Sequence, residues 1–302
     1  MKSIKSFFAK KNFKNFKNML KGRQNHLNRS IAGNSLLFVI MAVCGLFMAM
    51  PLIMLTNNAL KPLDELYQYP PNIFVRNPTL TNFTDLFSLV NLSWVPFSRY
   101  IVNTIIITGI SIAGHILCAS LAAYPLAKHK FRGRDFLFGL VIMSMMFSSQ
   151  VTQVSNYMVI SALGLSNTYP AVILPTFAYG VGLYLLKQFT EQIPDSMIES
   201  ARIDGASEWY ISFHIIMPNI KPAWLTSAIF QFQVIWSNTG RLLLRDEELK
   251  PMQYALTQIT ASVGREGAAA AIAFVMALIP ITFFLVCQSH IMETMISSGI
   301  KE

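Results

Sequence analysis

The sequence predicts an all-α membrane protein with six transmembrane helices. Hydrophobic residues make up 53% of the chain and charged residues 13%, which is more apolar surface than a soluble core can bury. Residues 136–186 form a run of 51 uncharged positions, and a helix of that length would exceed twice the roughly 30 Å hydrocarbon core, so this run must cross the bilayer twice. Other apolar runs supply four more crossings. The expected spans lie near residues 36–56, 100–127, 136–160, 168–187, 222–240 and 267–289.

The amino-terminal segment, residues 1–33, carries nine Lys or Arg and no acidic residue, whereas the rest of the chain holds fifteen of each sign. A basic segment directly before a membrane span follows the positive-inside rule, so we expect a cytoplasmic amino-terminal tail. Attraction to anionic lipid explains this charge better than nucleic-acid binding does, and no nucleic-acid partner is expected. The apolar run that follows begins too late and is too long for a cleaved signal peptide.

The second span is expected to follow an ordered outer loop, residues 57–99, which contains five prolines and balanced charge. Gly109 and Gly114 in this span allow close approach of other helices. His115 is its one ionisable residue, and we expect a packed neutral histidine rather than a ligand or a proton relay. The basic cluster at residues 128–134 then lies on the cytoplasmic side.

The third and fourth spans are separated by a short outer turn at residues 164–170. Polar side chains are unusually frequent in the third span, and Gln150, Gln153 and Tyr157 recur there on one helical face. An amide that faces lipid loses its hydrogen bonds to water, so this face should point at a water-filled path or at other helices. We expect Gln150 and Gln153 to line a path, and hydrogen bonding between helices of the same subunit remains the alternative.

The polar loop between the fourth and fifth spans, residues 190–221, is predicted to form two short helices that meet at a turn. Pro194 suits a first helical position, which places the start of the first helix near Ile193. Gly205 is the residue best able to adopt the left-handed conformation that ends a helix. The second helix then extends to Pro218. The predicted element is therefore a bent, L-shaped loop.

The charges of this loop do not follow the positive-inside bias. Counting crossings from the amino terminus places the loop in the cytoplasm, yet residues 187–221 hold three basic and five acidic residues. This balance favours a protein partner, and an amphipathic loop lying on lipid headgroups is the alternative.

The carboxy-terminal third of the chain supplies the last two spans. The fifth is of minimum length and contains Gln231 and Asn238. Residues 241–266 are expected outside, and residues 293–302 form a cytoplasmic tail. All three cysteines lie in apolar spans, without a metal-ligand spacing or a disulfide pattern.

The bent loop carries a specific motif. Glu199-Ser-Ala-Arg-Ile-Asp-Gly-Ala206, followed by Phe213, Ile216, Pro218 and Pro222, resembles the EAA loop of ABC importer permeases. Ser200 stands where that family has alanine, a small-for-small change. The resemblance implies a coupling helix that docks on an ATP-hydrolysing subunit and whose glutamate pairs with a basic residue there. The implied coupling residues are Glu199, Ala201, Asp204, Gly205 and Ala206.

The resemblance also implies a type I ABC importer transmembrane architecture and the role of a maltose-type second permease of the carbohydrate-uptake class. The implied setting is a bacterial cytoplasmic membrane, and the implied cargo is an oligosaccharide moved by alternating access. The implied partners are a second homologous permease, two ATP-binding subunits that bind the ATP and magnesium, and an extracellular solute-binding protein; this chain itself would hold no cofactor. The residues expected along the translocation path are Gln150, Gln153, Tyr157, Gln231 and Asn238.

Other function classes fit the sequence less well. The chain has no Gly-x4-Gly-Lys-Ser/Thr phosphate loop, so a separate subunit must hydrolyse ATP, and no catalytic constellation stands out. A secondary transporter would need charged residues inside its spans. The remaining alternative is an importer for another polar solute, such as a glycerol phosphodiester. The family often has Trp-Asn and then an acidic residue in the fifth span, whereas this chain reads Trp236-Ser-Asn, so this segment does not identify the solute.

Overall fold

The computed structural model describes residues 31–70, 72, 74–91, 95–238, 240–260 and 266–299, and every regular element in these ranges is a helix. Two compact units, residues 1–53 and 54–302, divide the chain. The first contains most of α2 (Ile31–Leu60), whose apolar side chains such as Phe38 and Phe47 are 74% and 76% exposed. A helix that is apolar all round suits a lipid environment, as expected for a first span. The basic amino-terminal tail lies outside the described residues, apart from residues 31–33.

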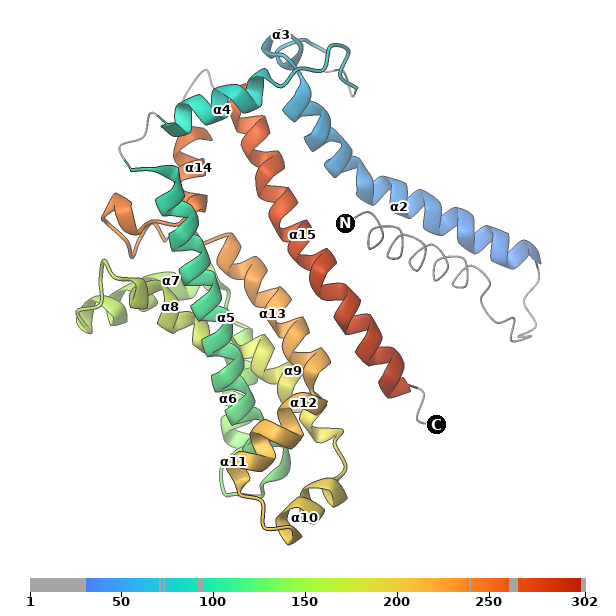
Figure 1. Cartoon of the computed structure of the whole chain (residues 1–302), viewed down its shortest axis with the longest axis vertical. Coiled ribbons are helices and arrows are strands. Elements are labelled where there is room, and N and C mark those ends of the chain that lie inside the picture. Colours follow the sequence, from blue (N-terminus) through green and yellow to red (C-terminus); the bar gives the residue numbers. More distant parts are fainter. Residues whose placement is uncertain are drawn as a thin grey trace, which may run out of the picture. The chain divides into compact units, whose positions relative to one another are not determined.

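The second unit is built around α5 (Phe97–Lys128), the long teal-to-green helix in Figure 1. It packs against α8 (Tyr169–Phe177), α9 (Gly180–Glu191) and α13 (Lys221–Trp236), and α13 in turn packs against α15 (Glu266–Gly299). The helix α15 also contacts α4 (Thr81–Asn91) and α14 (Met252–Thr260). The remaining elements of this unit are α3 (Leu63–Leu66), α6 (Arg134–Met145), α7 (Ser149–Ala162), α10 (Asp195–Ile203), α11 (Glu208–Tyr210), η1 (Ile211–Ile216), α12 (Met217–Asn219) and η2 (Glu247–Leu249).

Close packing between these helices depends on glycine, which has no side chain. A Cβ added at Gly114 would lie 2.2 Å from the ring of Phe177, so the predicted close approach is confirmed at this position. Gly109 differs, because its Cβ would meet no atom within 4 Å. The helical period explains the difference, since five residues along α5 turn the position toward another face.

His115 is fully buried and joins three helices. Its Nδ1 lies 3.0 Å from the carbonyl oxygen of Phe177 and its Nε2 lies 3.1 Å from Ser227 Oγ. A carbonyl can only accept, so Nδ1 carries the proton and donates, and in the neutral ring Nε2 accepts from the serine hydroxyl. The predicted packed histidine is therefore confirmed.

Opposite ends of α5 hold different segments. Near the amino-terminal end, Tyr100 donates to Glu247 Oε1 at 2.8 Å, and Asn103 donates to the backbone oxygens of Glu248 and Lys250 at 2.7 and 2.9 Å. Segment α10–α12 lies at the other end, as Figure 1 shows. With 32 residues, α5 is about 48 Å long, so it is long enough to cross a hydrocarbon core of roughly 30 Å, and these two segments lie at its opposite ends.

The crossings differ in part from the six expected spans. Four helical stretches within the described residues are long and apolar enough to cross: Gly33–Leu60, Ser98–Lys128, Tyr169–Glu191 and Glu266–Cys287. The expected third span is broken into α6 and α7, which are bent by 113° and become a fifth crossing if counted together. The expected fifth span is α13, whose 16 residues extend only about 24 Å.

Hydrogen bonds hold the described parts of the expected outer loop and the expected outer turn. Glu65 accepts from the backbone N–H groups of Arg76 and Asn77 at 3.1 and 3.0 Å. Asn167 has φ +64° and accepts at Oδ1 from the N–H groups of Arg245 and Asp246, both at 2.9 Å. At the carboxy terminus, the backbone of α15 stays helical to Gly299, so most of the expected tail from residue 293 continues the last helix.

Candidate functional site

The bent loop begins where α9 ends. Pro194 has φ −60° and ψ 135° and is the N-cap of α10, which starts at Asp195. The prediction of a start near Ile193 was two residues early, because the residue before a proline is pushed out of the helical region. Ile193 instead packs into the core and is 8% exposed.

Gly205 forms the corner of the loop, as predicted. Its φ is +81°, its N–H donates to the oxygen of Arg202 at 3.0 Å, and the N–H of Ala206 donates to the oxygen of Ala201 at 2.9 Å. These two bonds form a Schellman motif, which satisfies the carbonyls at the end of α10. A Cβ at Gly205 would meet nothing within 4 Å, so the backbone angle alone requires glycine here.

The second arm of the loop is one helical stretch of mixed type. Ser207 caps it by accepting from the N–H of Tyr210 at 3.2 Å, and the π-helix η1 follows α11 directly. The helix then continues one residue past Pro218, to Asn219. Pro218 lies in the last turn of this stretch and has no N–H to donate to the preceding turn. The predicted end at Pro218 is therefore one residue early.

The loop has a buried side and an exposed side. Ile198, Ile211, Ile216 and Ile220 are between 0% and 3% exposed and join a core cluster with Leu186 of α9. This burial fixes the loop against the helices that it connects.

The exposed side combines acidic and apolar residues. Ile203 is 86% exposed and Trp209 is 67% exposed, and Trp209 stacks on Phe213 with ring centroids 6.3 Å apart. Glu199 is exposed and forms no ion pair with a residue that the structure describes. Exposed apolar groups beside uncompensated acids are typical of a surface that binds another protein.

The five implied coupling residues have different environments. Glu199, Asp204 and Gly205 are exposed, Ala206 is half-buried and Ala201 is buried. The side chain of Ala201 therefore packs inward, and its carbonyl oxygen closes the corner. The three exposed members, and in part Ala206, are accessible to another subunit.

Charged groups hold the two arms together, and sequence reasoning did not find them. Arg202 and Glu208, on either side of the corner, form an ion pair with Nε and Oε1 2.9 Å apart. The hydrogen bond from Arg202, and then that from Tyr124, holds the pKa of Glu208 below its ordinary value of 4.5. Lys128 likewise lowers the pKa of Asp195 through a 2.8 Å hydrogen bond. Opposite charges flanking a predicted turn could have indicated the first pair, whereas no spacing links α5 to the loop.

The residues expected along the translocation path also differ in their exposure. Gln150 and Gln153 are exposed and Tyr157 is half-buried. Gln231 is 1% exposed and its amide donates to the backbone oxygens of Ser111 and Thr176 at 3.2 and 2.9 Å. This arrangement favours interhelical packing for Gln231, the alternative that the sequence left open.

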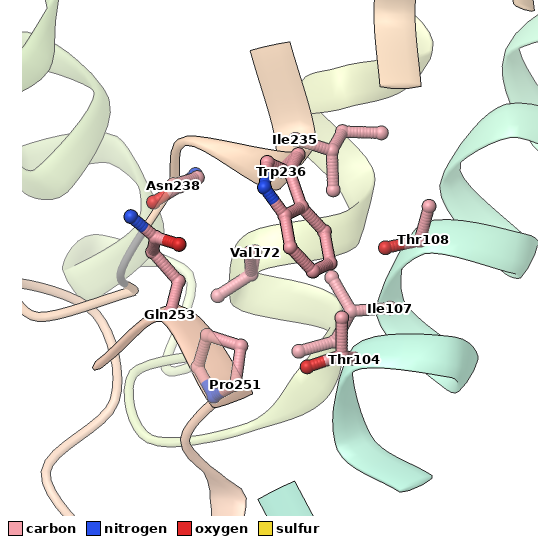
Figure 2. Close-up of a pocket in the computed structure, with 9 residues that line it drawn as sticks. All are labelled: Thr104, Ile107, Thr108, Val172, Ile235, Trp236, Asn238, Pro251 and Gln253. Atoms are coloured by element: carbon pink, nitrogen blue, oxygen red, sulfur yellow. The ribbon is translucent and has the colours of Figure 1, made fainter. Parts of the chain in front are cut away.

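Asn238, the last of these residues, is exposed and lies beside a small cavity (Figure 2). In that view Asn238 and Gln253 lie on one side, and Thr108 of α5 lies on the other. The cavity is about 10 Å³, room for roughly one water molecule and far too small for a sugar. Its lining is Thr104, Ile107, Thr108, Val172, Ile235, Trp236, Asn238, Pro251 and Gln253.

Known proteins resemble this chain over most of its length. Protein LplC of Bacillus subtilis is 34% identical over 72% of this chain and 72% of its own. The arabinooligosaccharides transport system permease protein AraQ of Halalkalibacterium halodurans is 28% identical over 83% of this chain and 90% of its own. A crystal structure of a bacterial ABC transporter involved in the import of the acidic polysaccharide alginate has a chain with a TM-score of 0.72 and 20% identity, covering 87% of this chain and 99% of that one.

A family model also matches residues 115–294, more than half of the chain. The matched region contains the whole bent loop and the helices on both sides of it. The likeness to the alginate transporter shows a shared fold, and the family assignment rests on the sequence matches. The chain belongs to the family of binding-protein-dependent transport system inner membrane components, as a permease without a catalytic role.

Proposed function

We propose that this permease subunit carries an oligosaccharide across the cytoplasmic membrane by alternating access. AraQ, named for arabinooligosaccharide transport, and the fold shared with a transporter of a polysaccharide support this cargo. An importer of another polar solute, such as a glycerol phosphodiester, is the competing function, because the loop motif does not depend on the solute.

The observation that carries the proposal is the bent loop between two helices of the membrane bundle. Its corner is set by the backbone of Gly205, its inner side is anchored in the core, and Glu199, Asp204 and Ile203 are exposed around the corner. A rigid, exposed element of this kind can dock in a groove of an ATP-hydrolysing subunit and move with it. Glu199 is the residue that would pair with a basic side chain there.

We propose that the loop and both chain termini face the cytoplasm, with six crossings in all. Local thinning of the bilayer and packing against neighbouring helices would let the short helix α13 span the membrane. The two ends of α5 support the sidedness, because they hold the bent loop and the segment with η2 on opposite sides.

The proposed assembly contains a second homologous permease, two ATP-binding subunits and an extracellular solute-binding protein. ATP and magnesium would bind to the ATPase subunits, and this chain would supply no cofactor site. The family description, which names binding-protein-dependent transport, supports the solute-binding partner.

The proposed path runs between the two permeases and is lined by Gln150, Gln153, Tyr157 and Asn238. Gln150 and Gln153 are exposed in this single chain, where a partner subunit or water would satisfy their amides. Cysteine at each position should react with a water-soluble thiol reagent in the assembled transporter, less so with substrate bound. Inertness in every state, with transport unchanged by Gln→Leu at both positions, would contradict this path.

The decisive experiment reconstitutes the complex with its solute-binding protein in lipid nanodiscs. We expect oligosaccharide-loaded binding protein to stimulate ATP hydrolysis, and proteoliposomes to accumulate the sugar. Stimulation by a glycerol phosphodiester and by no oligosaccharide of a broad panel would establish the competing function.

A further inference from the structure

The last turn of α5 contacts both ends of α10, although α5 is not covalently next to the loop. At the first end, Lys128 Nζ donates to the backbone oxygens of Glu191 and Ile193 and to Asp195 Oδ1, the last at 2.8 Å. An ammonium group has three protons, so these three acceptors use its full donor capacity. The Lys128 side chain is only 9% exposed, whereas the Asp195 side chain is 75% exposed.

Tyr124 makes the corresponding contact beyond the other end of α10. Its hydroxyl donates to Glu208 Oε2 at 2.6 Å, and the same carboxylate pairs with Arg202 at the end of α10. His129, just after α5, packs against Tyr124 with ring centroids 4.9 Å apart and ring planes tilted by 59°, and its Nε2 lies 3.3 Å from Glu208 Oε2. The helix therefore binds the loop on both sides of the corner.

Burial distinguishes these contacts from ordinary surface ion pairs. Exposed pairs contribute little, because water and salt compete for both partners. Tyr124 is 3% exposed and packs in the cluster that anchors the loop, so its hydroxyl has little access to water. A buried donor that loses its acceptor keeps its desolvation cost, and the same holds for the ammonium of Lys128.

We propose that Tyr124 and Lys128, called here the α5 clamp, are positioning residues that transmit movement of the loop to the membrane helices. The covalent chain connects the loop only to α9 and α13. α5 also packs against η1 of the loop, and the clamp adds polar contacts at both ends of α10 to this apolar packing. α5 itself packs against α8, α9 and α13. Displacement of the corner by an attached ATPase would then move α5 with it. This inference rests on the proposed function of the loop.

The test compares two clamp variants with two matched controls in the reconstituted complex. Tyr124→Phe removes one hydroxyl and keeps the ring, and Lys128→Met removes the ammonium. Tyr184→Phe changes a half-buried tyrosine that stacks on Phe138. Lys187→Met changes a lysine 12% exposed, whose 2.6 Å ion pair with Glu191 stays within α9. The readouts are ATPase co-purification, ATPase stimulation by loaded binding protein, and ATP hydrolysed per sugar transported.

Both clamp variants should co-purify with the ATPase at wild-type yield but lose stimulation about tenfold, the change that one charge-assisted hydrogen bond can make. ATP consumed per sugar should rise, and Lys128→Arg, which keeps the charge and several donors, should restore coupling in part. The controls should behave as wild type.

Wild-type stimulation and stoichiometry in Tyr124→Phe would overturn the clamp, and so would an equal loss in the controls. If Lys128→Met fails to assemble, the conservative Tyr124→Phe still decides. A wild-type complex without any stimulation would instead contradict the proposed function, so the two failures can be distinguished.

Discussion

Replacing Gly205 by valine should uncouple ATP hydrolysis from transport while membrane insertion stays intact. The Schellman corner holds this residue at φ +81°, and the space around its missing Cβ is open, so the cost comes from the backbone alone. An L-residue in the left-handed region costs about 1–3 kcal/mol, more for a β-branched side chain than for others. This lowers the share of correctly formed corners roughly 5- to 160-fold.

A series at this position tests that reasoning more sharply than one variant. Asparagine tolerates the left-handed conformation best among side-chain-bearing residues, so activity should fall in the order Gly, Asn, Ala, Val. The assay is ATPase stimulation and sugar uptake by the reconstituted complex, normalised to the amount of permease in the membrane. Undiminished coupling in Gly205→Val, or a loss in Gly205→Asn equal to that in Gly205→Val, would refute a role for the backbone angle.

Three further predictions concern docking, packing and pH. Glu199→Lys should reduce co-purification of the ATPase, since a like-charge contact at a desolvated interface costs several kcal/mol, and an unchanged yield would count against docking. Gly182→Ala should lower the melting temperature of the complex, because its Cβ would lie 2.0 Å from a buried imidazole nitrogen, while Gly109→Ala, with open space, should not. The hydrogen bonds from Arg202 and Tyr124 depress the pKa of Glu208, so its stabilising contribution is complete above about pH 4.5 and is lost as the pH falls through the depressed value. Thermal melts should therefore show a Glu208-dependent loss only in acid, and Glu208→Gln should remove that component; an equal acid loss in the variant would contradict it.

The broad architecture could be read from the sequence because lipid imposes a strong local rule. Uncharged runs of sufficient length predicted the helices that match Gly33–Leu60, Ser98–Lys128, Tyr169–Glu191 and Glu266–Cys287. For residues 136–160 the composition showed apolar character but did not predict the 113° bend between α6 and α7. Hydropathy indicates whether a segment is compatible with lipid, but it does not indicate where its helix bends.

The polar residues in the spans show a second limit. Gln150 and Gln231 have the same side chain and both lie in segments expected to cross the membrane, yet one is exposed and the other is buried with two backbone acceptors. Which amide finds a partner depends on the helices that happen to pack beside it. The sequence therefore predicted that such amides need polar surroundings, but not where those surroundings are.

The sequence by itself determined the corner of the loop, because a left-handed residue after α10 is a local backbone requirement that Gly205 satisfies without neighbours. Only the tertiary structure decided what holds that corner. Tyr124 and Glu208 are 84 positions apart and lie 2.6 Å from each other, as do His115 and Ser227 at 112 positions and 3.1 Å. Dihedral preferences act within a few residues, whereas these contacts exist only because packing brings α5 against the loop and against α13.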